Sequence, residues 1–367
     1  MLEKKQHIAA QLSKGPIYRV FRGDYRTIFA ISSVVFCNYS VPITQTTIDN
    51  MGLLRRLAVS MMSDERLHVD QRTDKAVPEF LQFNMERNLP ICDMPMHRGY
   101  YIFPSVQSFE AFKRSRGATI EKLDANAMGV PLLRLDRQFL THGMTMIDSE
   151  IKYKVYRYEV RSCFDPPPYG VDVRECIIVA EDAQFKVYKY LYANIYKADK
   201  LTQSALKISF VGGDNSGLQG DDNSLYMLHR REFRDMDTCI KGFNLRWHVR
   251  YSPLENDHYK LALLNPREPS LMDSPQTIAN KKKANITKIN PYTAVLGHYT
   301  SEAEDLLPGL IVKDADFIIG ENGSPANIGI ANIPELTIIF AAQALVLHCV
   351  EREKEKKRRR RNRRVLI

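Results

Sequence analysis

An apolar segment near the carboxyl end constrains the fold of this chain more than any other feature. Residues 336–350 read LTIIFAAQALVLHCV, and residues 354–364, which follow closely, hold nine basic residues and one acid. Such a pair of segments fits a helix buried inside the fold, a membrane anchor, or a helix that ends in a targeting or anion-binding tail. Most of what the sequence says about function depends on which of these is correct.

The length and polarity of the segment favour burial in protein. Fifteen helical residues span about 22 Å, whereas the hydrocarbon core of a bilayer is about 30 Å thick. Gln343 and His348 interrupt the segment with polar groups that lipid could not satisfy. Because apolar side chains cover every face of the helix, it must be enclosed. We therefore predict a core helix over 334–351, in which His348 is a buried histidine and a proton switch is the alternative.

The segment before this helix has the texture of antiparallel sheet. Residues 206–210, 245–251 and 259–263 alternate apolar and polar side chains, which is typical of strands with one buried face. In residues 153–160 the alternation slips at Val155 and Tyr156, as a β-bulge would cause. A many-stranded sheet with one apolar face must close or be covered. The sequence thus predicts a mainly β protein, a closed antiparallel barrel over 149–351 around the C-terminal helix.

Residues 1–148 have a mixed α/β pattern and are predicted to form an accessory region. Strands are expected within 25–41, a helix over 47–67, and short helices over 80–89 and 109–116. The insert 265–289 is expected to be a mobile loop, and residues 352–367 a disordered basic tail.

The positive charge of the chain is concentrated near its carboxyl end. The formal net charge is +9, of which the run at 354–364 supplies +8, so the remainder of the chain is nearly neutral. This distribution indicates an interaction tail or a nuclear localisation signal, and it disfavours a basic domain that follows a phosphate backbone.

Motifs for catalysis or metal binding are not recognisable. The six cysteines are scattered without a CxxC pair, which fits free thiols in a reducing compartment and predicts no metal site. The sequence contains no G-x-S-x-G or H-E-x-x-H motif, and its glycine-rich segment at 212–222 lacks the Lys-Ser/Thr of a phosphate loop. We expect a non-enzymatic intracellular protein without a cofactor.

Three segments carry a resemblance to a known family: residues 243–252 (FNLRWHVRYS), residues 309–313 (GLIVK) and the terminal apolar helix with its basic run. Together they resemble the tubby C-terminal domain and the related LURP-one and phospholipid-scramblase proteins, in which a β-barrel surrounds a C-terminal hydrophobic helix. The resemblance implies binding of phosphoinositides or anionic membrane surfaces by basic side chains outside the barrel. Candidate contacts for such anions are Lys186, Arg246, Arg250, Lys356, Lys357, Arg358, Arg359, Arg360 and Arg361.

The expected function is therefore that of a binding or adaptor protein at anionic phospholipid surfaces. Two alternatives use the same carboxyl end: a nuclear protein that binds nucleic acid through the basic tail, and a tail-anchored membrane protein. The expected location is cytoplasmic, peripheral to a membrane, or nuclear.

Overall fold

The structure is a computed structural model. The chain divides into two compact units, Met1–Asp64 and Glu65–Ile367, and all residues described here belong to the second unit. The strands predicted within 25–41 and the helix predicted over 47–67 lie outside the described residues. The described residues are 77–94, 97–115, 123, 125–137, 151–168, 175–200, 203–211, 223–230, 234–250, 258–284, 291–301, 311–324 and 327–365.

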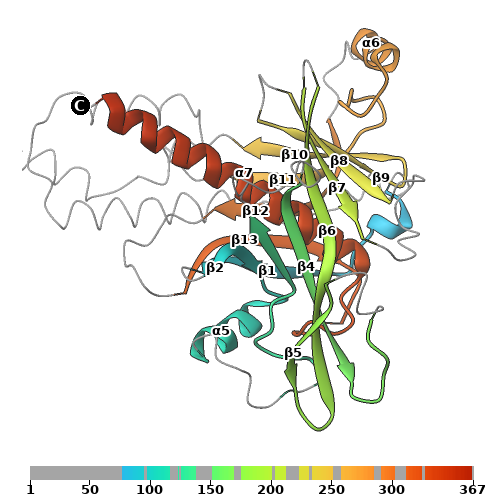
Figure 1. The fold of residues 1–367 in the computed structure, drawn as a ribbon. Helices are drawn as coiled ribbons and strands as arrows, with labels where there is room; N and C mark the ends of the chain where they lie inside the picture. The colour runs from blue at the N-terminus through green and yellow to red at the C-terminus, as the bar shows by residue number, and fades with distance from the viewer. Residues whose placement is uncertain are drawn as a thin grey trace, which may run out of the picture. The chain divides into compact units, whose positions relative to one another are not determined.

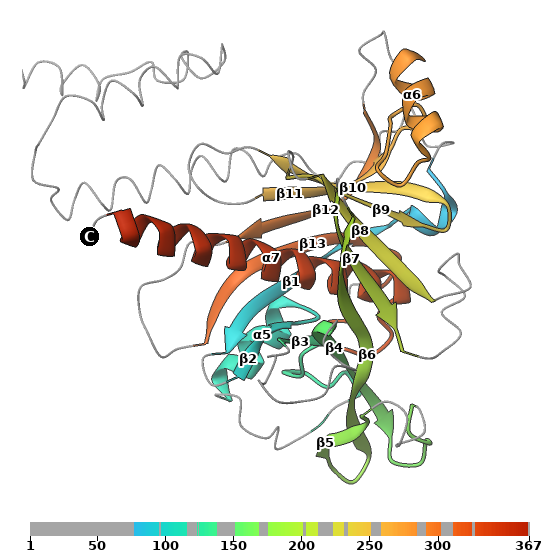
Figure 2. The ribbon, with the colours of Figure 1, turned by 45° about the horizontal axis from the view of Figure 1, so that its top comes forward.

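A closed antiparallel barrel forms the body of the described region, as predicted. Twelve strands follow one another in the order β4-β3-β2-β1-β13-β12-β11-β10-β9-β8-β7-β6, and pairing of β4 with β6 closes the ring. Strand β5 is added outside the ring, on β6. Figures 1 and 2 show the ring from two directions. The strands are β1 (Met85–Met94), β2 (His97–Ile102), β3 (Leu133–Arg137), β4 (Ile151–Ser162), β5 (Ile177–Glu181), β6 (Phe185–Lys200), β7 (Gln203–Phe210), β8 (Ser224–Arg230), β9 (Met236–Ile240), β10 (Phe243–Arg250), β11 (His258–Leu264), β12 (Tyr292–Ser301) and β13 (Val312–Glu321).

The barrel begins earlier in the chain than the boundary predicted at 148/149. Strand β1 pairs with β13 over nine residue positions, and β3 pairs with β4. Without β1, β2 and β3 the ring would be open between β13 and β4. Part of the predicted accessory region is therefore barrel wall, and the helix predicted over 80–89 is wrong. Those residues form a short 3₁₀ helix, η2 (Glu79–Leu81), and the start of β1.

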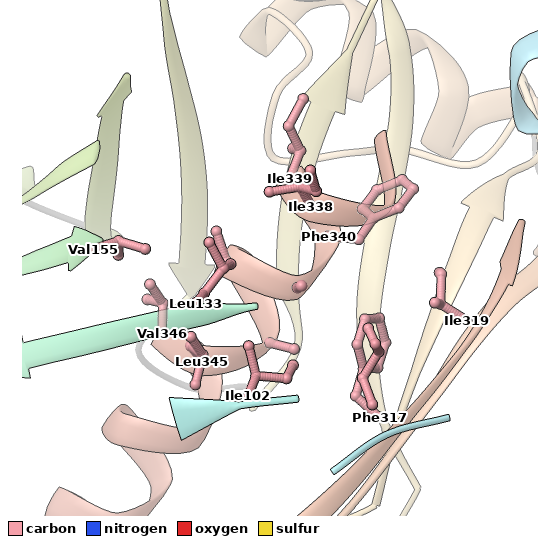
Figure 3. Packing of buried hydrophobic residues seen from close by; sticks show 14 of the residues in the cluster. Ile102, Leu133, Val155, Phe317, Ile319, Ile338, Ile339, Phe340, Leu345 and Val346 are labelled. Atoms are coloured by element: carbon pink, nitrogen blue, oxygen red, sulfur yellow. The ribbon is translucent and has the colours of Figure 1, made fainter. Parts of the chain in front are cut away.

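The apolar half of helix α7 (Glu335–Val365) fills the barrel. Ile338, Leu345 and Val346 have no solvent exposure. Figure 3 shows Leu345 and Val346 close to side chains that point inward from the strands, such as Ile102 and Leu133. Full burial of one such side chain stabilises the fold by about 1.5–3 kcal/mol. The predicted core helix is confirmed, and the absence of a polar face is explained because strands surround it.

Two polar contacts join the helix to the barrel wall. The Trp247 Nε1–H of β10 donates to Gln343 Oε1 at 2.8 Å, and both residues are fully buried. At the start of the helix, the Glu335 carboxylate accepts from Arg157 and from the Tyr192 hydroxyl, each at 2.7 Å. An acid in the first helical turn also interacts favourably with the helix dipole.

Within the described residues, two further α-helices lie outside the barrel. Helix α5 (Val106–Arg114) overlaps the helix predicted over 109–116 and is capped by Ser105, whose Oγ accepts from the Ser108 N–H at 3.1 Å. Helix α6 (Pro275–Ala284) lies within the insert that was expected to be a loop. Its first turn is capped by Ser274, whose Oγ accepts from the Thr277 N–H at 3.2 Å.

Candidate functional site

The basic residues at the carboxyl end form an exposed extension of the core helix, which we call the basic arm (residues 354–361 of α7). A disordered tail was predicted from residue 352, but α7 continues to Val365. Figures 1 and 2 show its last turns extending past the ends of the barrel strands. Six predicted anion contacts lie on this arm, and all six are exposed: Lys356, Lys357, Arg358, Arg359, Arg360 and Arg361.

Glutamates spaced among the cations explain why this segment is helical. Glu351 accepts from Lys354 at 2.7 Å, and Glu355 accepts from Arg352 at 3.2 Å and from Arg359 at 2.7 Å. These are i,i+3 and i,i+4 pairs, which stabilise a helix by a few tenths of a kcal/mol each. The buried half of α7 also supplies the helix nucleus, so that continuation needs only propagation.

A second set of contacts fixes the helix where it leaves the barrel; we call it the exit collar. Glu353 accepts from Lys152 at 3.0 Å and from the Tyr153 hydroxyl at 2.6 Å. Glu351 accepts from Arg234 at 2.7 Å. Burial alone would raise the pKa of each glutamate, but the neighbouring cations and hydroxyl lower both pKa values below the ordinary range. The collar therefore stays charged near neutral pH and holds the arm in a defined direction.

Three polar residues complete the collar on its inner side. Asp314 of β13 accepts from Arg352 at 2.9 Å, and its other oxygen lies 3.9 Å from His348 Nε2. His348 Nδ1 is 2.7 Å from the Tyr299 hydroxyl. The sequence singled out His348 but gave no signal for Asp314, because strand pairing sets their proximity.

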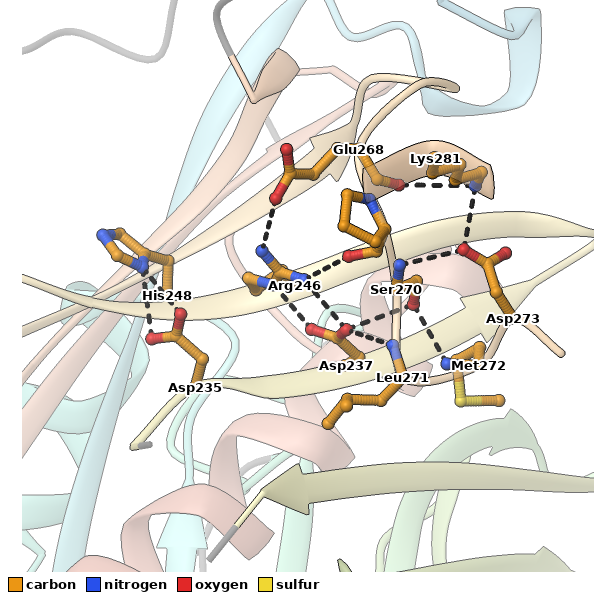
Figure 4. Close-up of polar contacts among 11 residues, drawn as sticks. Asp235, Asp237, Arg246, His248, Glu268, Ser270, Leu271, Met272, Asp273 and Lys281 are labelled. Atoms are coloured by element: carbon orange, nitrogen blue, oxygen red, sulfur yellow. Dashed lines mark hydrogen bonds and ion pairs between the residues drawn. The ribbon is translucent and has the colours of Figure 1, made fainter. Parts of the chain in front are cut away.

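Arg246, an expected anion contact, is occupied by protein oxygens. Its guanidinium makes two hydrogen bonds to Asp237, at 2.7 and 3.0 Å, and further bonds to Glu268 and the Pro269 carbonyl. Figure 4 shows that Asp237 also accepts hydrogen bonds from the Ser270 hydroxyl and the Leu271 N–H. This network holds the loop before α6 against β9 and β10. An anionic ligand would have to displace Asp237 to reach Arg246.

Of the other two expected contacts on strands, only Lys186 has a side chain that the structure describes. Lys186 of β6 lies 3.0 Å from Glu181 of β5, and this hydrogen bond raises the pKa of Lys186. The Arg250 side chain lies outside the described residues, although its backbone ends β10. The structure therefore gathers six of the nine predicted contacts on one helix and leaves Lys186 and Arg246 elsewhere.

One pocket accompanies the Arg246 network. It has a volume of about 200 Å³ and is lined by Asp235, Glu268, Leu271 and Ile278, together with the network itself. Its carboxylates make it a poor receptor for anions. Among the residues that the structure describes, no three His, Cys, Asp or Glu side chains are placed to hold a metal ion. In the same part of the chain, every helix is too short or too polar to cross a membrane.

Comparison with known proteins gives the family of the chain. Protein DIA1 of Saccharomyces cerevisiae is 34% identical over 313 residues, which cover 82% of this chain and 89% of that protein. The uncharacterized protein YOR385W of the same yeast is 28% identical over 298 residues, covering 80% of this chain and 97% of its own length. No solved structure is significantly similar. The DIA1 family model matches residues 84–356, from the start of β1 to the basic arm, and the chain belongs to this family.

Proposed function

We propose that this protein is a non-enzymatic binding or adaptor protein that associates with anionic phospholipid surfaces through its basic arm. One observation carries the proposal: the arm is an exposed cationic helix whose other half is anchored in the barrel core. A cation close to an anionic leaflet gains about 1 kcal/mol. The exit collar supports the proposal because it presents these charges beyond the barrel wall.

Flotation with lipid vesicles tests this function. Wild-type protein should float with vesicles that contain phosphatidylglycerol and stay behind with neutral phosphatidylcholine vesicles. A triple variant, R358Q/R360Q/R361Q, removes three cations from the arm. At about 1 kcal/mol per charge, it should bind anionic vesicles about 100-fold more weakly.

A matched variant separates the arm from net charge. R267Q/K282Q/K283Q removes three exposed cations beside and on α6, so its net charge equals that of the arm variant. It should float like the wild type. Equal flotation of both triple variants, or of wild type on neutral and anionic vesicles, would contradict the proposal. Vesicles with a phosphatidylinositol bisphosphate at matched total charge test the preference for phosphoinositides.

Nucleic acid is the second candidate because the arm carries cations on all sides. Six consecutive basic residues at 100° per residue surround the helix, so a flat bilayer meets only some of them. The major groove of duplex DNA, about 12 Å wide, admits a whole helix. Anisotropy of a labelled duplex should then show binding that weakens steeply with salt. The absence of binding at low salt would exclude this candidate.

The relation to tubby-like domains is also proposed. It is supported by the architecture, a barrel closed around a C-terminal apolar helix. The family match is to DIA1, so an experimental structure of this chain and its fold comparison would test the relation.

A further inference from the structure

The inner side of the exit collar contains an incomplete hydrogen bond. His348 is fully buried, and its Nε2 has no hydrogen-bond partner. The nearest acid oxygen is Asp314 Oδ2, 3.9 Å away, while Asp314 Oδ1 accepts from Arg352 at 2.9 Å. A buried polar atom that lacks a partner costs about 1–3 kcal/mol, so this gap between His348 and Asp314 is unfavourable.

A single proton would complete the bond. Either the Tyr299 hydroxyl or His348 Nδ1 can be the donor in the bond between them. In the tautomer whose Nδ1–H donates to Tyr299, His348 Nε2 is an acceptor, and it faces an ionised carboxylate that can only accept. Protonated Asp314 would instead donate to His348 Nε2, and its negative charge beside Arg352 would disappear.

The surroundings place that proton on Asp314 at mildly acidic pH. Burial raises the pKa of Asp314 to about 6; Arg352 opposes this rise, the Asp93 carboxylate of β1 adds to it, and a hydrogen bond from the Asp93 backbone N–H lowers the pKa again. Burial also lowers the pKa of His348, assisted by Arg352, Arg137 and Lys356, so the imidazole stays neutral. The groups that face this pair are Cys92 and Asp93 of β1, Tyr100 of β2, Arg137 of β3, Tyr299 of β12, and Cys349, Arg352, Glu355 and Lys356 of α7.

We propose that Asp314 and His348 form a proton-operated latch at the base of the basic arm. On acidification Asp314 takes up one proton, donates it in a hydrogen bond to His348, and gives up its ion pair with Arg352. The base of the arm then carries one more positive charge than at neutral pH. This inference rests on the proposed function, because it makes association of the arm with anionic surfaces stronger in acid. One charge near the surface corresponds to about a fivefold change in binding.

The test compares flotation at pH 7.5 and pH 5.5 on phosphatidylglycerol vesicles. Wild type should bind about fivefold more tightly at pH 5.5. Asp314→Asn imitates the protonated acid, since its amide can donate to His348. This variant should bind at pH 7.5 as tightly as wild type does at pH 5.5, and its own response to pH should be smaller. Asp165→Asn, an exposed acid in the turn after β4, is the matched control and should respond like wild type. Equal responses of wild type and Asp314→Asn would overturn the latch.

Thermal unfolding distinguishes failure of the latch from failure of the proposed function. The difference in Tm between wild type and Asp314→Asn should change between pH 4 and pH 7, because only wild type can lose the proton. A difference that stays constant overturns the latch, whatever the vesicles show. If no protein floats at either pH while this Tm difference changes, lipid binding is refuted and the latch is retained.

Discussion

The buried ion pair between Arg87 and Glu321 gives the sharpest stability prediction. Arg87 Nε donates to Glu321 Oε1 at 2.8 Å, and its Nη1 donates to the Pro104 carbonyl at 2.9 Å. The second carboxylate oxygen accepts from Thr337 at the start of α7, at 3.1 Å. The side chains of Arg87 and Glu321 are only 4% and 0% exposed. One carboxylate therefore ties β1, β13 and the core helix together.

Glu321→Gln should destabilise the protein by about 3–5 kcal/mol. The substitution keeps the shape of the side chain but leaves the Arg87 guanidinium buried without a counter-charge, which is the costly way to break a buried pair. Trp247 is the only tryptophan in the chain and lies in the barrel, so its fluorescence reports unfolding in urea. With a denaturant slope of about 3 kcal/mol per M, the midpoint should fall by about 1 M or more.

Two further variants serve as controls for the Glu321→Gln result. Glu181→Gln breaks the solvent-accessible pair with Lys186 and should leave the urea midpoint nearly unchanged. The double change Arg87→Met with Glu321→Leu removes both charges and should recover much of the lost stability, even if Glu321→Gln alone fails to fold. A loss of stability below about 1 kcal/mol for Glu321→Gln would refute the reasoning. Leaving the buried Arg87 guanidinium without a counter-charge would then cost no more than breaking a solvent-accessible pair.

Three other changes test single packing and polar contacts. Gln343→Leu should cost about 1–3 kcal/mol and shift the fluorescence of Trp247, because the buried indole N–H loses its acceptor; an unchanged spectrum would contradict this. Burial lowers the pKa of His348 in the folded protein. In mildly acidic solution the unfolded chain therefore binds a proton at His348, whereas the folded protein does not. In the Asp314→Asn background, where the latch cannot respond to pH, the protein with His348 should lose stability relative to the one with His348→Gln as the pH falls below about 6.5, and urea midpoints at pH 7 and pH 5 check the sign. Gly320→Ala should cost about 1–3 kcal/mol in thermal or urea unfolding, because a Cβ there would lie 2.5 Å from the Phe83 ring.

The sequence predicted those parts of the fold that depend on local pattern. The alternation around Trp247 corresponds to β10, and the slip at Val155 and Tyr156 is a shift in the pairing of β4 with β6. The core helix was predictable because no apolar-all-round helix can remain exposed. Each of these signals is the spacing of apolar residues along one strand or helix, which can be read without knowing what packs against it.

Features that depend on distant partners were not predictable. Strand β1 contains Pro90 and turns the charged Arg87 inward, so it lacks the usual apolar alternation; Glu321, which makes this possible, lies 234 residues away. Arg246 looked like a solvated cation until Asp237 and the loop before α6 were placed beside it. For the site, the cations of the basic arm were found from sequence, but their helical conformation and the exit collar were not. Composition favoured disorder, whereas the glutamates and the anchored helix favour α-helix.

The position of α7 in the chain has a consequence for biosynthesis. Every strand of the barrel precedes this helix in the chain. The ribosome therefore synthesises all the strands before it synthesises the helix that fills the barrel. Until residues 335–350 emerge, the inward side chains of twelve strands have no permanent partner. A polypeptide whose translation stops before this helix should therefore expose the apolar inner face of its strands, and chaperones and proteases should recognise that surface.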